Sequence, residues 1–158
     1  MRKPRLLQEG AKYHVTARAN RQEMIFDSDA MKALFEDVVA RAKKKFSFRV
    51  DNFCVMGNHF HLIVQPAKNV SLSSIMQWIM SVFAQAWNRF HGLSGHVWGQ
   101  RFFSRILQTA ESFVQTFQYI DTNPVRAGLV VVAEEWAFGG CFHRAKGRKD
   151  IVDEKAEP

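Results

Sequence analysis

The fold of this 158-residue chain is decided by one stretch, Phe48-Arg49-Val50-Asp51-Asn52-Phe53-Cys54-Val55-Met56-Gly57-Asn58-His59-Phe60-His61-Leu62-Ile63-Val64-Gln65. Its two halves are rich in β-branched and aromatic residues, and Gly57-Asn58 between them is a turn-forming pair. Apolar runs on both sides of such a turn are typical of a β-hairpin. We therefore expect strands over residues 48–56 and 59–65, with Pro66 ending the second.

Helical patterns lie on both sides of this hairpin. Before it, the capping cluster Asp27-Ser28-Asp29 precedes apolar residues at i, i+3 and i+4 spacing, and Lys43-Lys44-Lys45 closes the segment. After it, a longer apolar stripe predicts a helix from about Ser73 to Phe90, stopped by Gly92. A third helix is predicted from Glu111 to about Thr122.

Two further extended segments complete the pattern, over residues 13–18 and 96–107. The order β-α-β-β-α-β with an appended helix predicts an α+β fold, a ferredoxin-like split β-α-β antiparallel sheet with helices on one face and an appended C-terminal helix. We expect the appended helix, a partner or a ligand to cover the other face. The prediction is one domain over residues 1–142, with a basic N-terminal arm of about residues 1–10, and a charged, flexible tail over 143–158.

The charge balance points to a polyanionic partner. The chain has 22 Lys and Arg against 15 Asp and Glu, a net charge of +7. A basic surface attracts nucleic acid or an anionic membrane alike. No run of about 18 apolar residues is present, and the basic start lacks the apolar length of a signal peptide. We expect no membrane association and a cytoplasmic, nucleoid-associated protein of a bacterial-type cell.

The sharpest local feature is the pair His59 and His61. Side chains alternate along a strand, so these two imidazoles should project from one face while Phe60, Leu62 and Val64 project from the other. Two neutral imidazoles held side by side can bind a divalent metal. The alternative interpretation is a pair of surface histidines in a half-exposed strand.

The second feature is Tyr119, one of two tyrosines in the chain. It lies off the predicted apolar stripe of its helix, and Gln115 and Asn123 share its face at i−4 and i+4. A phenol with a pKa near 10 is a weak nucleophile. A metal that polarises a phosphate would make attack by Tyr119 feasible. The alternative is an ordinary tyrosine on an amphipathic surface.

These features lie within blocks that resemble a known family, the single-tyrosine HUH transposases, in the branch of REP-associated tyrosine transposases. The likeness covers roughly residues 11 to 140 and includes the first strand and loop, Tyr13 to Arg21. Residues 56–64 resemble the family's His-hydrophobic-His motif. The later blocks are Trp98-Gly99-Gln100-Arg101-Phe102-Phe103-Ser104-Arg105 and Tyr119-Ile120-Asp121-Thr122-Asn123-Pro124-Val125-Arg126-Ala127-Gly128-Leu129.

The resemblance implies that His59 and His61 are ligands of Mg²⁺ or Mn²⁺ and that Tyr119 is the catalytic residue. Asn123 matches the position of the third ligand, which contributes an amide oxygen. Because a residue before proline is disfavoured in a helix, Asn123 could instead cap a short helix begun by Pro124. The implied activity is metal-dependent cleavage and strand transfer of single-stranded and hairpin DNA with REP-like palindromes, through a 5′-phosphotyrosine, by a monomer or homodimer.

Five arginines in the family-like blocks are candidates for phosphate contact, and solvated surface is the alternative for each. They are Arg18, Arg21, Arg101, Arg105 and Arg126. Trp98 and Phe103 either stack on bases or belong to the core. The remaining histidines, at positions 14, 91, 96 and 143, are interpreted as structural. Two rival functions stay open, a catalytically silent DNA-binding repressor and a water-using metallo-phosphodiesterase.

Overall fold

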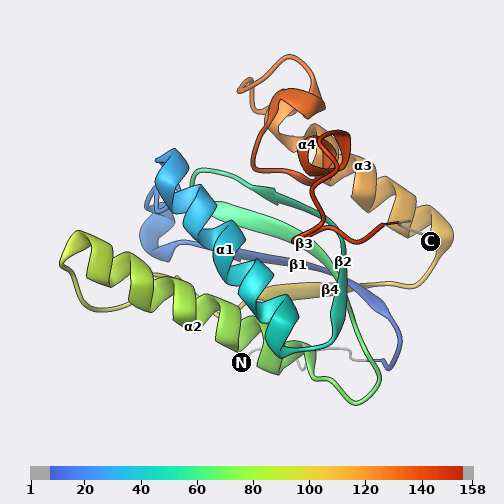
Figure 1. The fold of residues 1–158 in the computed structure, drawn as a ribbon, viewed down its shortest axis with the longest axis horizontal. Coiled ribbons are helices and arrows are strands. Elements are labelled where there is room, and N and C mark those ends of the chain that lie inside the picture. Colours follow the sequence, from blue (N-terminus) through green and yellow to red (C-terminus); the bar gives the residue numbers. More distant parts are fainter. Residues whose placement is uncertain (1–7, 155–158) are drawn as a thin grey trace.

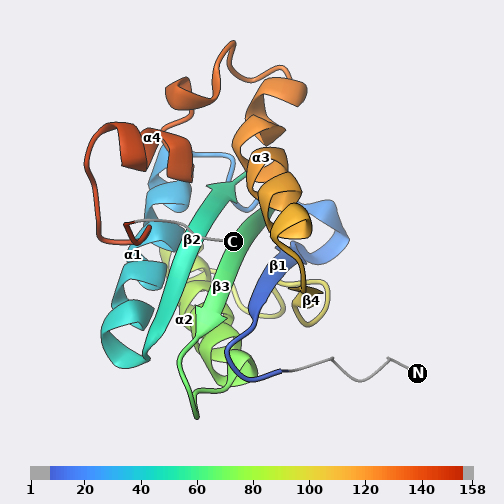
Figure 2. The same cartoon turned by 90° about the vertical axis from the view of Figure 1, so that its right-hand side faces the viewer.

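The computed structural model describes residues 8–154, where a four-stranded antiparallel sheet lies between helices on both faces (Figures 1 and 2). The strands pair in the order β2-β3-β1-β4, with β1 (Lys12–Arg18), β2 (Phe48–Val55), β3 (His59–Pro66) and β4 (Phe103–Leu107). Helix α1 (Asp29–Lys45) follows β1, and α2 (Leu72–His91) follows β3. Each β-α-β unit is thus split by an intervening strand, as the sequence predicts.

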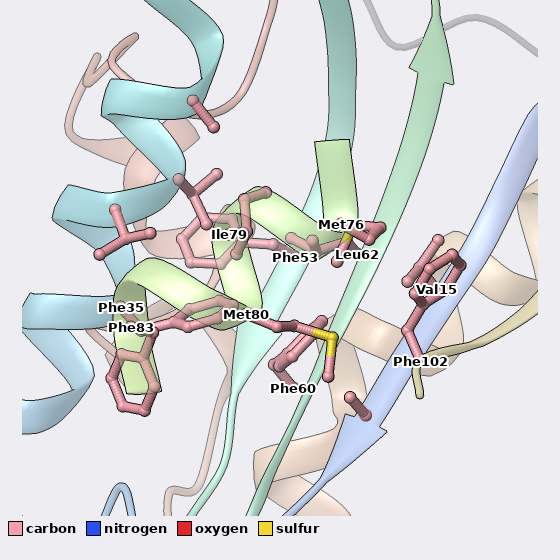
Figure 3. Packing of buried hydrophobic residues seen from close by; sticks show 14 of the residues in the cluster. Val15, Phe35, Phe53, Phe60, Leu62, Met76, Ile79, Met80, Phe83 and Phe102 are labelled. Carbon is pink, nitrogen blue, oxygen red and sulfur yellow. The ribbon is translucent and has the colours of Figure 1, made fainter. Parts of the chain in front are cut away.

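Helices α1 and α2 cover one face of the sheet and enclose the main core (Figure 3). Phe60 and Leu62 of β3 project into this core from alternate positions and are fully buried. Phe35 of α1 lies 4.6 Å from Phe60 and 5.7 Å from Phe83 of α2, measured between ring centroids. Burial of these aromatic side chains is the main force that holds the helices on the sheet. Neither α2 nor any other helix among the described residues is long and apolar enough to span a membrane.

The opposite face is covered by α3 (Ala110–Arg126), the predicted appended helix (Figure 2). A capping box starts it, since Thr109 Oγ1 accepts from the Ser112 N–H and Ser112 Oγ accepts from the Thr109 N–H. Its apolar side, led by Phe113 and Ile120, packs on Ile63 of β3 in a second, smaller cluster. The remaining short elements are η1 (Asn20–Gln22), η2 (Ala133–Glu135) and α4 (Gly140–Ala145).

An extra residue in β2 sets which of its side chains face α3. Val50 pairs with Val64 and Asn52 pairs with Ile63, so Asp51 is a β-bulge without a partner on β3. The bulge lets Val50 join the main core while Asn52, two positions later, points to α3. The buried Asp51 carboxylate is 2.7 Å from Lys12 Nζ, which compensates its charge.

Two predicted boundaries are wrong. Residues 96–102 form no strand. Within this segment, Trp98 makes an isolated β-bridge to Ala19, and its indole N–H donates to the Met80 carbonyl of α2. Helix α3 does not stop at Thr122 but continues through Pro124 to Arg126, so Asn123 lies inside the helix and does not cap a new one. A single proline removes only one N–H, and the Ala127 N–H still closes the last turn on Asn123 O at 3.0 Å.

The expected flexible tail from residue 143 is also wrong for residues 143–154. His143 is fully buried, with Nε2 2.8 Å from Glu36 of α1. Ile151 is buried too, and its carbonyl accepts from Lys43 Nζ at 2.7 Å. Most residues of this segment are charged, which is why the sequence predicts a flexible tail. A few buried apolar residues and paired polar residues nevertheless attach it to α1. Residues 155–158, and residues 1–7 of the expected basic arm, lie outside the part of the chain described.

Candidate functional site

Strand β3 brings His59 and His61 to the face covered by α3. Extended backbone alternates its side chains, so Phe60 enters the main core while both imidazoles take the other side. Their ring centroids are 5.0 Å apart, with the planes at 82°. Pairing with β1 places Arg18 opposite His59 and Thr16 opposite His61.

Each imidazole has its Nδ1 atom engaged by a neighbour. His59 Nδ1 is 2.8 Å from the Asn58 side-chain oxygen, and His61 Nδ1 is 3.0 Å from His14 Nε2. An amide oxygen only accepts hydrogen bonds, so the neutral His59 ring carries its proton on Nδ1. Its Nε2 is then unprotonated and has a free lone pair. On the other side of His61, its Nε2 is 3.5 Å from the Asn123 side-chain amide.

All three histidines of this cluster are neutral at pH 7. Burial lowers the pKa of His14 and of His59 to about 4, assisted by Arg105 and Arg18 respectively. Burial lowers the pKa of His61 to about 3, with smaller contributions from neighbouring histidines and arginines. Neutral imidazole is the form that binds a metal, so no proton has to be removed first.

Tyr119 approaches this cluster from α3. Its side chain is 48% exposed, off the buried side of the helix, and its ring centroid is 5.8 Å from that of His61. Asn123, one helical turn later, faces the same imidazole. The Arg126 guanidinium lies 4.2 Å from the centroid of the Tyr119 ring and donates to the Tyr119 carbonyl at 2.9 Å. Residues about 60 positions apart in the chain therefore meet at one point.

Two adjoining hollows open around this meeting point, with Thr16 and Phe103 lining both. The first has a volume of about 440 Å³ and is lined by His14, His61 and Tyr119 among others. The second, of about 520 Å³, continues past the end of β1. Phe103 is 68% exposed between them, whereas Trp98 is packed into the core. Of the two aromatic candidates for base stacking, Phe103 is exposed and Trp98 is partly buried against the core.

Four of the five predicted arginines line these hollows. The second hollow contains Arg18, Arg21 and Arg101. Arg105 lines the first hollow and donates to Thr116 Oγ1 at 3.0 Å. Arg126 lies against Tyr119. The site is therefore bordered by guanidinium groups on several sides, which suits a polyanionic ligand.

His14 is the site residue that we did not expect. We interpreted it as structural, yet it lies on the same face of β1 as Thr16 and Arg18 and touches His61. The period-two alternation His14, Thr16, Arg18 was the available signal. Across residues 8–154, no three or more His, Cys, Asp or Glu side chains are grouped to hold a metal. A metal here would therefore need oxygen ligands from an amide or from substrate.

Comparison with known proteins gives the family. A family model described as "Transposase IS200 like" matches residues 8–123, a segment that includes both histidines of β3, Tyr119 and Asn123. The chain belongs to the IS200-like transposase family. It is similar to the REP-associated tyrosine transposase of Escherichia coli, with 26% identity over 116 residues that cover 73% of this chain and 67% of the relative.

A second relative and a solved structure are similar to this chain. A Haemophilus influenzae sequence named for the same type of transposase is 22% identical over 120 residues, covering 70% of this chain and 68% of the relative. In structure, the chain is similar to a REP-associated tyrosine transposase bound to a REP hairpin. The TM-score is 0.78 at 21% identity, and the alignment covers 100% of this chain and 97% of the other. The chain therefore shares its fold, a four-stranded antiparallel sheet with helices and an appended helix, with that protein.

Proposed function

We propose that this transposase is a metal-dependent single-strand DNA endonuclease and strand transferase that acts on hairpin DNA through a 5′-phosphotyrosine. One observation carries the proposal. Tyr119 and Asn123, on one face of α3, meet His61 of β3 at a hollow that Tyr119, His61 and Arg105 line. A nucleophile, neutral imidazoles that can hold a metal, and cationic side chains suit metal-assisted phosphodiester transfer by a tyrosine.

The donor set fits a divalent metal. His59 has an unprotonated Nε2. The Asn123 amide, whose nitrogen is 3.5 Å from His61 Nε2, would offer its oxygen as a hard ligand after rotation of the amide group. Nitrogen donors are accepted by Mn²⁺, and oxygen donors from the amide and a phosphate suit both Mn²⁺ and Mg²⁺. Held by these residues, the ion would polarise the scissile phosphate and neutralise the charge that develops on it.

The chain's own residues account for the covalent steps. The Tyr119 hydroxyl loses its proton and attacks the phosphorus, the bond to the 3′ oxygen breaks, and that oxygen takes up a proton to leave as a 3′-hydroxyl. The 5′ end of the DNA is then esterified to Tyr119. A 3′-hydroxyl from another strand attacks this ester and restores the phenol, so the strands are joined without ATP because the phosphoester bond is conserved.

The hollows suggest the path of the DNA. A strand whose scissile phosphate lies at Tyr119 can cross Phe103 and continue along Arg18, Arg21 and Arg101. Phosphates would contact the guanidinium groups, and a base would stack on the exposed ring. The two hollows adjoin at the exposed Phe103 ring, so DNA that follows both must bend around this side chain. A flexible single strand can bend in this way more easily than a stiff duplex. The hairpin bound by the structural relative supports a hairpin with a single-stranded flank as the substrate.

One chain suffices for this site, because α3 packs on the sheet of its own chain. This supports catalysis by a monomer, although a homodimer of two such sites is equally compatible with the chemistry. The charge of +7 and the DNA substrate support action in the cytoplasm of a bacterial-type cell, at the nucleoid.

Tyr119→Phe tests the proposal, because it keeps the ring and removes only the attacking oxygen. With labelled hairpin DNA and Mn²⁺, the native protein should form a denaturation-resistant adduct and the variant none, at similar DNA affinity. Tyr13→Phe, which alters the other tyrosine in the chain, is the matched control and should form the adduct. Binding without cleavage by the native protein would indicate a silent DNA-binding protein. Cleavage without an adduct, retained by Tyr119→Phe, would indicate a water-using phosphodiesterase.

A further inference from the structure

His14 and His61 meet edge to edge rather than face to face. Their nearest ring nitrogens, His14 Nε2 and His61 Nδ1, are 3.0 Å apart, whereas the ring centroids are 5.2 Å apart. The ring planes differ by only 16°. Two nearly coplanar imidazoles whose nitrogens approach this closely share one hydrogen bond, in which one ring donates and the other accepts.

The surroundings of His61 decide the direction of that bond. Its other nitrogen, Nε2, faces the Asn123 amide nitrogen at 3.5 Å, and an amide N–H is a donor. Nε2 must then present a lone pair, so the single proton of the neutral ring lies on Nδ1. His61 is therefore the donor to His14, and His14 Nε2 is the acceptor.

We propose that His14 is a positioning residue that accepts the Nδ1 hydrogen bond of His61 and thereby keeps His61 Nε2 unprotonated and directed toward Asn123. Asn58 does the same for His59, whose Nδ1 it holds at 2.8 Å. Histidines that bind metals usually donate their second ring nitrogen to such a partner, which fixes both tautomer and orientation. The structure thus assigns β1 a part in metal binding although β1 contributes no ligand.

The importance of this contact for metal rests on the proposed function, but the tautomer is measurable without metal. Long-range ¹H–¹⁵N spectra at pH 7 of the metal-free protein should show His61 protonated on Nδ1. In His14→Leu, which has no acceptor for the Nδ1 proton, the His61 proton should move to Nε2 as the Asn123 amide turns its oxygen toward that nitrogen. In His14→Gln, whose amide oxygen can replace the accepting nitrogen, the Nδ1 proton should be retained. His96→Leu, which removes an exposed imidazole, is the matched control.

Calorimetric titration with Mn²⁺ measures the consequence. We expect about 10- to 100-fold weaker binding for His14→Leu, the range for loss of such a supporting contact. His14→Gln should stay within a few-fold of the native protein, and His96→Leu should match it. These measurements use the unliganded full chain and do not depend on DNA cleavage.

Two results would overturn the inference: native His61 protonated on Nε2 in the metal-free protein, or unchanged Mn²⁺ affinity in a folded His14→Leu variant. The native tautomer requires no variant, so the first test stands even if His14→Leu does not fold. Failure of the proposed function looks different. Native protein with the expected tautomer and Mn²⁺ affinity but without a Tyr119–DNA adduct would refute the nuclease mechanism and leave the role of His14 intact.

Discussion

Asn52 ties α3 to the sheet, and we expect Asn52→Ala to lower the free energy of unfolding by about 3 to 5 kcal/mol. The buried side-chain amide donates to the Phe117 carbonyl at 3.0 Å and to the Asp121 carboxylate at 2.9 Å. Its oxygen accepts from the Phe53 N–H and from Arg144, each at 3.0 Å. Two neutral bonds contribute about 2 kcal/mol together. The two bonds to charged groups contribute about as much once the partial exposure of Asp121 and Arg144, 18% and 32%, is allowed for.

Urea denaturation followed by tryptophan fluorescence measures this change, with the slope m expected to stay constant. Asn88→Ala is the matched control, because partly exposed Asn88 on α2 donates a side-chain hydrogen bond to the Gly95 carbonyl, and its loss should cost less than about 1 kcal/mol. Folded Asn52→Ala should also form less Tyr119–DNA adduct, since α3 is held less firmly. A loss of stability below about 1 kcal/mol at unchanged m would refute the reasoning that these bonds hold the helix.

Four further outcomes are expected. His59→Ala should abolish Mn²⁺ binding in calorimetry while the protein stays folded, and an unchanged dissociation constant would argue against the metal site. Phe103→Ala should weaken binding of a hairpin with a single-stranded flank by about 1–3 kcal/mol and leave blunt duplex unaffected; equal losses for both DNAs would contradict stacking. Binding should weaken with salt at a log–log slope near −3 to −4, from about −0.7 per phosphate over roughly four to six contacts, whereas a slope near zero would indicate a merely solvated basic surface. Finally, the pKa values of about 4, 4 and 3 for the three clustered histidines lie below the ordinary 6.5. The unfolded chain therefore binds their protons first as pH falls, and stability present at pH 7 should decrease towards pH 5; equal urea midpoints at these two pH values would show that the imidazoles are not buried.

Much of the architecture could be read from local patterns. The hairpin, the first two helices and the start of α3 depend on alternation, on 3.6-residue periodicity and on caps such as Ser28, all of which are local properties of the chain. The end of α3 could not be read in the same way. Pro124 disfavours a helix locally, but burial of its ring and packing of α3 on the sheet outweigh the one lost hydrogen bond.

The candidate site divides in the same manner. The shared face of His59 and His61, and the position of Tyr119 off its apolar stripe, follow from strand and helix periods and were predictable. That Tyr119, Asn123 and His61 meet depends on how α3 lies across the sheet, which contacts such as that from Asn52 to Asp121 determine. The same long-range packing brings the exposed Phe103 between the two hollows.

The sequence by itself determined most of the elements, their order, the paired imidazoles and the position of Tyr119 off the apolar side of its helix, because each depends on residues within one or two turns or strand positions. Only the tertiary structure decided that His14 supports His61, that residues 143–154 join the domain, and that Asn123 remains helical beside the site. These features rest on pairs such as Glu36 and His143, which lie 107 positions apart. No local pattern encodes such a pair, because its energy exists only once the chain has folded and removed both groups from water.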